Sequence, residues 1–295
     1  MGGVALYERG WRRALTYALF LGPSVVGVAV FLVGPILASL VLAFMNWDLL
    51  TPPRFAGLAN FQALLQDPEF WAALQHTLTF LAGYIPLVML LGLLVAVALN
   101  NHIPGQGLYR ALFFLPVVTA WVAVALVWKW LLNPSYGLVN NFLGLWGLQG
   151  PAWLFDPNWA MPAVILTSVW KDTGFVMAIL LAGLQGIPRE YYEAASIDGA
   201  SGPQKLHYVT LPLLAPALLF ALTISLINSF QVFDQVYVMT GGGPAGATTV
   251  LVERIVKNAF SYSRMGYAAA MSWVLFVLIF LTTLLLSRAR RGWSA

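Results

Sequence analysis

Residues 77–99 read TLTFLAGYIPLVMLLGLLVAVAL, a run of 23 residues without a charged side chain. A helix of about 20 apolar residues is long enough to cross the hydrocarbon core of a bilayer. Pro86 lies within the run, and a membrane helix tolerates it because neighbouring helices can satisfy the freed backbone groups. The stretch therefore predicts a membrane-spanning helix.

The composition of the whole chain has the same character. Of 295 residues, 60% are hydrophobic and 9% are charged, and the mean hydropathy is +0.79. An ordinary soluble domain carries about 25% charged residues, so this composition excludes a soluble enzyme. The chain has no Cys and only three His, none of them at zinc-site spacing, so metal or thiolate catalysis is not expected.

Long apolar runs recur along the chain. They predict an all-α, polytopic membrane protein with six transmembrane helices over about residues 14–45, 77–99, 111–132, 162–184, 211–230 and 267–287. The first run exceeds one span and contains Pro23 and Pro35, so it is either one long tilted helix or a short entry helix followed by the span. It is also too long for a cleaved signal peptide.

Lys and Arg are distributed unequally between the two sides of the predicted bundle. With a cytoplasmic N-terminus, nine lie on the cytoplasmic side, namely Arg9, Arg12, Arg13, Arg110, Arg189, Lys205, Arg288, Arg290 and Arg291. Five lie on the opposite side, namely Arg54, Lys129, Arg254, Lys257 and Arg264. Because cytoplasmic loops carry the excess of basic residues, both termini are predicted to be cytoplasmic. The net charge of +4 is then explained by the excess of basic residues on the cytoplasmic side and does not indicate a nucleic-acid partner.

The segment between the fourth and fifth runs, residues 185–210, reads QGIPREYYEAASIDGASGPQKLHYVT. Pro188 suits the first turn of a helix, and Gly199 can supply the left-handed cap that ends it. Gly202-Pro203 then starts a second short helix. Two short helices around a glycine turn, on the cytoplasmic side, have the shape of a docking element for another protein.

The residues of this loop resemble a known signature. Glu193-Ala194-Ala195, Gly199 and Leu211-Pro212 look like the EAA motif of permease subunits in binding-protein-dependent ABC importers. In that family the loop forms coupling helices that insert into a groove of a cytoplasmic ATPase. The resemblance implies that the ATPase-coupling residues are Glu193, Ala194, Ala195, Asp198, Gly199, Ala200, Leu211 and Pro212. Gly202-Pro203 departs from many relatives, which place an aromatic or basic residue there.

Further motifs are similar to the carbohydrate-uptake class of these importers, and to the first permease subunit of maltose, multiple-sugar and glycerol-3-phosphate systems. They are FDQVYVMTGGGP at 233–244, ATT at 247–249, Leu115-Pro116, Asn133-Pro134 and Asn60-Phe61. The resemblance covers about residues 12–290. It implies the type I ABC importer permease fold, as a single transmembrane permease domain over 1–295 with the EAA coupling loop at 185–210.

The same resemblance implies the partners. They are a second homologous permease subunit in a heterodimer, two ATPase subunits or domains, an extracytoplasmic solute-binding protein, a sugar and the lipid bilayer of the cytoplasmic membrane. The chain has no GxxxxGK[ST] loop. It is therefore not expected to be an enzyme or to bind a cofactor, and ATP and Mg²⁺ are expected on the separate ATPase.

Polar residues within two spans are candidates for the substrate pathway. Lys171 and Asp172 lie near the middle of the fourth run, where charges are costly and face a cavity or a partner helix. Ser168, Asp172 and Phe175 share one helical stripe and would suit a sugar, although a salt bridge between helices is an equal alternative. In the fifth run, hydrogen bonds between neighbouring helices are one explanation for Ser225, Asn228 and Ser229. By the resemblance, both stretches fall where the maltose permease contacts sugar.

Three alternatives remain. Lys171 would favour an importer of glycerol 3-phosphate or another anion, although Asp172 argues against a simple positive trap. An ion-coupled secondary transporter would show inverted repeats and acidic sites in broken helices, and we find no convincing repeat. A membrane enzyme would need convergent catalytic residues, whereas His102, His207 and Glu193 have no evident partner at catalytic spacing.

Overall fold

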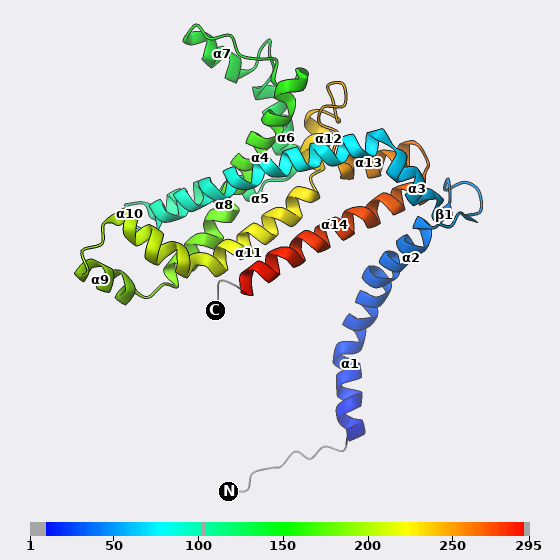
Figure 1. The fold of residues 1–295 in the computed structure, drawn as a ribbon, viewed down its shortest axis with the longest axis horizontal. Helices are drawn as coiled ribbons and strands as arrows, with labels where there is room; N and C mark the ends of the chain where they lie inside the picture. Colours follow the sequence, from blue (N-terminus) through cyan, green and yellow to red (C-terminus); the bar gives the residue numbers. More distant parts are fainter. Residues whose placement is uncertain (1–9, 102–103, 292–295) are drawn as a thin grey trace. The chain divides into compact units, whose positions relative to one another are not determined.

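A computed structural model describes residues 10–101 and 104–291. Arg9, used above for the orientation, and His102 lie outside the described residues. Figure 1 shows helices joined by loops, and the only strands in the described part form one short pair. The prediction of an all-α protein is confirmed. Contacts divide the chain into two compact units where one domain is expected: Met1–Leu64 with Asn258–Trp273, and Leu65–Lys257 with Val274–Ala295.

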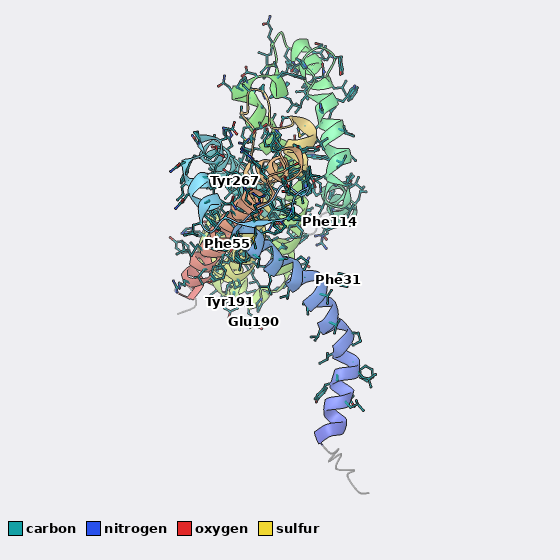
Figure 2. The ribbon with its side chains drawn as sticks, turned by 90° about the vertical axis from the view of Figure 1, so that its right-hand side faces the viewer. Phe31, Phe55, Phe114, Glu190, Tyr191 and Tyr267 are labelled. Atoms are coloured by element: carbon teal, nitrogen blue, oxygen red, sulfur yellow. The ribbon has the colours of Figure 1, made fainter. Side chains whose placement is uncertain are left out.

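The first unit begins with a long apolar helix. It consists of α1 (Gly10–Val28), a π-helical turn (Ala29–Val33) and α2 (Gly34–Ala43). The wider turn precedes Pro35, whose ring would clash with the carbonyl four residues earlier in a regular helix. Leu15–Ala43 is therefore one continuous helix and not an entry helix followed by a span. No residue of its most apolar 18-residue window is buried, and Phe31 is 82% exposed (Figure 2).

A short hairpin follows, with β1 (Met45–Asn46) antiparallel to β2 (Arg54–Phe55), and α3 (Ala59–Gln66) comes next. The side chain of Asn60 donates hydrogen bonds to the carbonyls of Ala43 (2.9 Å) and Met45 (2.8 Å). The first bond satisfies a carbonyl at the end of α2 that lacks a partner within the helix, and the second joins α3 to β1. A Cβ at Gly266 would collide with the Met45 carbonyl, so glycine permits this close approach.

The second unit holds the remaining helices. They are α4 (Pro68–Leu99), α5 (Gln106–Val118), α6 (Trp121–Leu131), α7 (Leu138–Leu145), α8 (Pro157–Gln185), α9 (Arg189–Ile197), α10 (Gly202–Lys205), α11 (Leu211–Phe230), α12 (Asp234–Met239) and α13 (Leu251–Val256). A 3-10 turn covers Trp153–Phe155 and a π-helical turn covers Leu206–Thr210, while a second π-helical turn, Lys257–Ser261, begins in this unit and continues in the first. The last helix, α14 (Met265–Arg291), begins in the first unit and continues in the second.

Helix α8 is the central element of the second unit. Two thirds of its most apolar 18-residue window is buried (67%), against 33% for α4, and it packs on α4, α5 and α11. Glycines permit these close crossings. A Cβ at Gly83 of α4 would lie 2.8 Å from Ile165 Cδ1, and one at Gly174 would collide with the Phe113 carbonyl of α5. Small residues are the usual means by which membrane helices approach one another.

The third expected span, residues 111–132, is not one helix. Helices α5 and α6 meet at a 98° bend, where Thr119 is extended and Ala120 is not helical. Hydropathy does not register this break, because the apolar run continues across it. Among the described residues, five helices are long and apolar enough to cross a membrane, and the number is six if the bent pair is counted as one span. The six predicted spans correspond to that upper number.

Several helices also begin before their apolar runs. Helix α4 begins at Pro68, and α8 at Pro157, in each case after an aspartate that caps the helix. Asp67 accepts a hydrogen bond from the Glu69 N–H (2.9 Å). Polar residues such as Glu69, Gln75 and Asn158 interrupt the apolar pattern of these first turns, so the capping pattern is the clearer sign of where the helices begin.

Candidate functional site

The second unit contains a cavity of about 440 Å³. It lies between α4, α6, α8, the end of α11 and the start of α12. Its walls combine aromatic rings, amides and two carboxylates, and its lining residues are Phe80, Tyr84, Trp121, Asp172, Asn228, Ser229, Gln231, Val232, Phe233, Asp234 and Gln235. Pockets that combine apolar rings with a few polar groups are typical of small-molecule binding.

The crossing of α4 and α8 forms one wall of this cavity. The Tyr84 hydroxyl donates a hydrogen bond of 2.9 Å to Asp172 Oδ2, joining residues 88 positions apart. The ring of Phe80 stacks on Tyr84 one turn away, with centroids 5.3 Å apart. The hydrogen bond fixes the orientation of the carboxylate and leaves its other oxygen available to a ligand hydroxyl.

Lys171, the neighbour of Asp172, does not line the cavity. Its side chain is 4% exposed and its ammonium donates to the Val117 carbonyl (3.1 Å). Val117 lies in the last turn of α5, where carbonyls have no partner within the helix. The ammonium also lies 4.9 Å from the centroid of the Trp121 ring, a cation–π contact. Lys171 therefore stabilises the bend between α5 and α6 and holds Trp121 at the cavity.

The end of α11 and the residues after it form the opposite wall. Asn228 and Ser229 line the cavity, and Ser229 Oγ also donates to the Leu226 carbonyl (2.8 Å). Ser225, one turn earlier, is 2% exposed and lies behind the wall. The chain then leaves the helix, so that residues 231–235 contribute consecutively to the lining.

The cavity includes three of the seven substrate residues predicted from the sequence, namely Asp172, Asn228 and Ser229. The other four, Ser168, Lys171, Phe175 and Ser225, are not among its lining residues. Ser168 is fully buried, donates to the Val164 carbonyl (2.8 Å) and accepts from Gln235 Nε2 (3.4 Å), so it supports a lining residue.

Sequence reasoning missed most of the wall. Phe80, Tyr84 and Trp121 were not selected because aromatic residues are common in apolar helices and carry no signal of facing a cavity. For residues 231–235 a signal existed, since Gln231, Asp234 and Gln235 are polar residues next to an apolar run.

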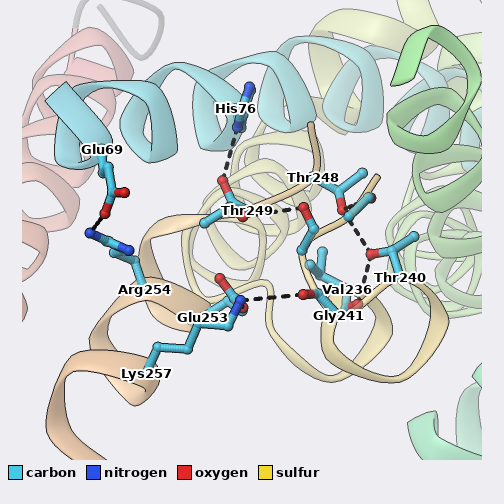
Figure 3. A network of polar contacts seen from close by, with 12 residues as sticks. Glu69, His76, Val236, Thr240, Gly241, Thr248, Thr249, Glu253, Arg254 and Lys257 are labelled. Atoms are coloured by element: carbon cyan, nitrogen blue, oxygen red, sulfur yellow. Dashed lines mark hydrogen bonds and ion pairs between the residues drawn. The ribbon is translucent and has the colours of Figure 1, made fainter. Parts of the chain in front are cut away.

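A hydrogen-bonded loop anchors α12, which carries Asp234 and Gln235 (Figure 3). Thr240 and Thr248 share a hydrogen bond of 2.7 Å, and Thr249 Oγ1 donates to the Gly242 carbonyl (3.2 Å). Lys257 donates to the Gly241 carbonyl (3.3 Å) and pairs with the buried Glu253. The GGGP segment is thereby fastened to α13, so the cavity wall on α12 has a rigid support.

The loop between α8 and α11 contains the predicted helix, glycine turn and helix. Helix α9 ends in a Schellman motif, in which the Gly199 N–H bonds the Ser196 carbonyl (3.1 Å) and the Ala200 N–H bonds the Ala195 carbonyl (2.9 Å). Gly199 has φ +78°, the left-handed conformation that glycine adopts without strain.

The second helix differs from expectation. Helix α10 begins with a capping box between Ser201 and Gln204, but it does not end before the fifth span. Gly202–Phe230 is one continuous apolar helix that includes the π-helical turn. The bonds from Lys205 Nζ to Ser196 Oγ (2.7 Å) and between Tyr192 and Thr210 (3.1 Å) join α9 to this helix. Movement of α9 would therefore act directly on the span.

The predicted coupling residues lie at the surface of this loop. Glu193, Ala194, Asp198, Gly199 and Pro212 are exposed, and Ala195, Ala200 and Leu211 are half-buried. Large apolar side chains are exposed beside them: Tyr191 (53%), Ile197 (88%) and Tyr208 (73%). Figure 1 shows α9 beyond the ends of α8 and α11. Exposed apolar groups gathered on one short element are typical of a protein-docking surface.

Apolar helices long enough to cross a membrane, a cavity lined by polar and aromatic side chains and an exposed helical loop are the features of a membrane transport subunit. Residues 88–293 match the family described as the inner membrane component of binding-protein-dependent transport systems, and the chain belongs to this family. It is a multi-pass membrane protein and a permease of the ABC importer class.

The chain aligns with named permease proteins over nearly its full length. The chain is 38% identical to the probable ABC transporter permease protein YesP of Bacillus subtilis, over 93% of this chain and 90% of that protein. It is 36% identical to the trehalose/maltose transport system permease protein MalF of Thermococcus litoralis, over 95% of each.

A crystal structure of a bacterial alginate ABC transporter, in complex with a periplasmic protein that holds an alginate pentasaccharide, contains a similar chain. The two chains superimpose with a TM-score of 0.84 at 26% identity, over 97% of each. The predicted type I importer permease fold is confirmed.

Proposed function

We propose that this chain is the permease subunit through which a sugar or sugar-like solute crosses the cytoplasmic membrane, driven by ATP hydrolysis on separate subunits. The cavity is lined by side chains that are suited to binding a polyhydroxylated solute. Its aromatic rings, Phe80, Tyr84, Trp121 and Phe233, offer faces on which a sugar ring can stack. Its amides and carboxylates can bond hydroxyl groups. The relatives named for trehalose and maltose and for alginate support the same cargo class.

The exposed loop at residues 185–210 is the observation that carries the ATP-driven mechanism. Its apolar side chains Tyr191, Ile197 and Tyr208 are more than half exposed in the described part of the chain, and Ile197 is the most exposed at 88%. We assign this loop to the cytoplasmic face, as the distribution of Lys and Arg predicts. An ATPase subunit that receives α9 in a groove would cover these side chains, and its closure would move the continuous helix Gly202–Phe230.

The proposed assembly contains a second homologous permease subunit, two ATPase subunits or domains and an extracytoplasmic binding protein that delivers the cargo. ATP and Mg²⁺ belong to the ATPase in this proposal, because the chain lacks a Walker A loop. ATP binding would switch the spans from inward- to outward-facing, and release of ADP and phosphate would reset them.

A pull-down tests the docking role. The chain would be purified in gentle detergent from native membranes as the wild type and as Ile197→Glu. Because Ile197 is almost fully exposed, this change leaves the fold intact, whereas it places a charge in the proposed interface. Leu145→Glu, at another exposed site (82%) on α7, is the matched control.

We expect the wild type and Leu145→Glu to retain an ATPase and a second permease, and Ile197→Glu to lose the ATPase alone. A wild-type chain that purifies without partners and transports in liposomes without ATP would refute the proposal. That result would favour an ion-coupled carrier.

A further inference from the structure

The cavity has a one-sided distribution of charge. Asp172 and Asp234 both line it, and no Lys, Arg or His is among the lining residues in the described part of the chain. The remaining polar groups of the wall are neutral amides and the hydroxyls of Tyr84 and Ser229. A bound molecule therefore meets two acidic groups and no cation.

The cation next to Asp172 in the sequence is already engaged. Lys171 donates its hydrogen bond to the Val117 carbonyl at the end of α5, and its ammonium packs against Trp121. Adjacent residues on a helix point about 100° apart. While Asp172 faces the cavity, Lys171 consequently lies behind the wall at 4% exposure. Turning Lys171 toward a cargo would leave the α5 carbonyl without its partner.

This arrangement discriminates between cargoes by charge. At an effective dielectric constant of about 20, one carboxylate at about 8 Å weakens the binding of an anion roughly 30-fold. Lys171 lies behind the wall and interacts electrostatically with Asp172, so it offsets part of that carboxylate's effect, while Asp234 adds a second carboxylate that keeps the balance of charge at the cavity negative. An uncharged sugar pays no such penalty and can stack on the aromatic rings.

We propose that the cavity takes uncharged or amine-bearing saccharides and rejects saccharides that carry carboxylate or phosphate groups. The inference rests on the proposed sugar-import function and narrows its cargo. The fold alone does not dictate this choice, because alginate, the cargo of the structurally similar importer, is an acidic polysaccharide. The lining residues decide it.

The absence of Cys from the chain permits a test that does not require the natural cargo. A single cysteine would be introduced as Asn228→Cys in the cavity or, as a control, as Ser135→Cys in an exposed loop. The complete importer would be treated with a cationic methanethiosulfonate (ethyltrimethylammonium) or an anionic one (ethylsulfonate). Modification of this subunit would be followed by mass spectrometry.

We expect the ratio of cationic to anionic reaction rates to be about tenfold or more higher at Asn228→Cys than at Ser135→Cys. In the Asn228→Cys background, a further Asp172→Asn substitution should reduce that ratio several-fold. Asp234→Asn, at an exposed residue, gives a second test if the Asp172 variant folds poorly. Asp48→Asn, which lies outside the cavity lining, should not change it. A ratio equal to that of the control, or one that neither cavity substitution lowers, would overturn the proposal.

The complete importer without these substitutions, reconstituted in liposomes with ATP, would be offered neutral maltodextrins and oligogalacturonates of equal length. ATP-driven uptake of the neutral set alone is expected. Equal uptake of the oligogalacturonates would overturn the charge selectivity while leaving sugar import standing. No ATP-driven uptake of either set, with the reagent preference intact, would instead refute the proposed function on which the cargo class depends.

Discussion

Gly199→Val tests the coupling loop by changing one backbone conformation. Gly199 has φ +78°, and a Cβ built there meets nothing within 4 Å. The substitution therefore causes no collision, and its whole cost is that of placing a β-branched residue in the left-handed region. That cost is about 2 kcal/mol, because L-residues lose about 1–2 kcal/mol there and branching adds to it.

This cost is large for the element that bears it. Helix α9 has nine residues and none of them is buried, so little packing holds it in place. The hydrogen bonds from Lys205 to Ser196 and between Tyr192 and Thr210 contribute about 1 kcal/mol each. A loss of about 2 kcal/mol thus cancels these bonds and reduces the population of the capped loop roughly 30-fold.

The assay is ATP-driven uptake by the complete importer in proteoliposomes, with the apparent melting temperature in detergent measured alongside. Gly199→Val should lower uptake about tenfold or more at an unchanged melting temperature. Gly199→Asn should retain most activity, since Asn adopts the left-handed conformation more readily. Gly202→Ala is the matched control, because Gly202 also meets nothing within 4 Å and its φ is not positive. Normal uptake by Gly199→Val, or an equal loss in Gly202→Ala, would refute the reasoning.

Three further substitutions address packing and the cavity. Thr77→Val should destabilise the chain by about 1–3 kcal/mol, because Thr77 is buried and its hydroxyl accepts a hydrogen bond of 3.0 Å from a backbone N–H of α13. The melting curve of this variant would be compared with that of Thr79→Val, a substitution at an exposed site. Equal melting curves would contradict the prediction. Gly174→Ala should lower stability by about 1–3 kcal/mol, because the new methyl meets the Phe113 carbonyl, and an unchanged melting temperature would show that α5 moves freely from α8. Asn228→Leu should weaken uptake several-fold without loss of assembled complex, and unchanged uptake would exclude this side chain from the cargo site.

Local features of the sequence could be predicted where the responsible physics is local. The glycine turn at Gly199 was predicted because a helix end requires a particular backbone conformation at one position. In the first span, Pro35 was compatible with one helix or with two. The π-helical turn in the structure shows that the helix continues past Pro35 as one element. The start of α4 at Pro68 was missed because Glu69, Gln75 and His76 interrupt the apolar run in its first turns.

The cavity illustrates what could not be predicted. Lys171 and Asp172 were correctly noticed as unusual within a membrane span, but their partners lie 54 and 88 residues away, at Val117 and Tyr84. Neither partner has a distinctive sequence context. The break between α5 and α6 depends on the same tertiary contacts, so the run from 111 to 132 gave no sign of it.

The sequence by itself determined the membrane location, the helical class and the helix, glycine turn and helix at residues 185–210. These follow from the length of apolar runs and from capping residues, which act within a few positions along the chain. The tertiary structure alone decided which residues face the cavity, where the third span bends and which groups contact the Lys171 ammonium. In a membrane a helix can be apolar on every side, so its hydrophobic pattern does not distinguish the face toward lipid from the face toward protein. Only the packing of α4, α6, α8 and α11 around one another makes that distinction.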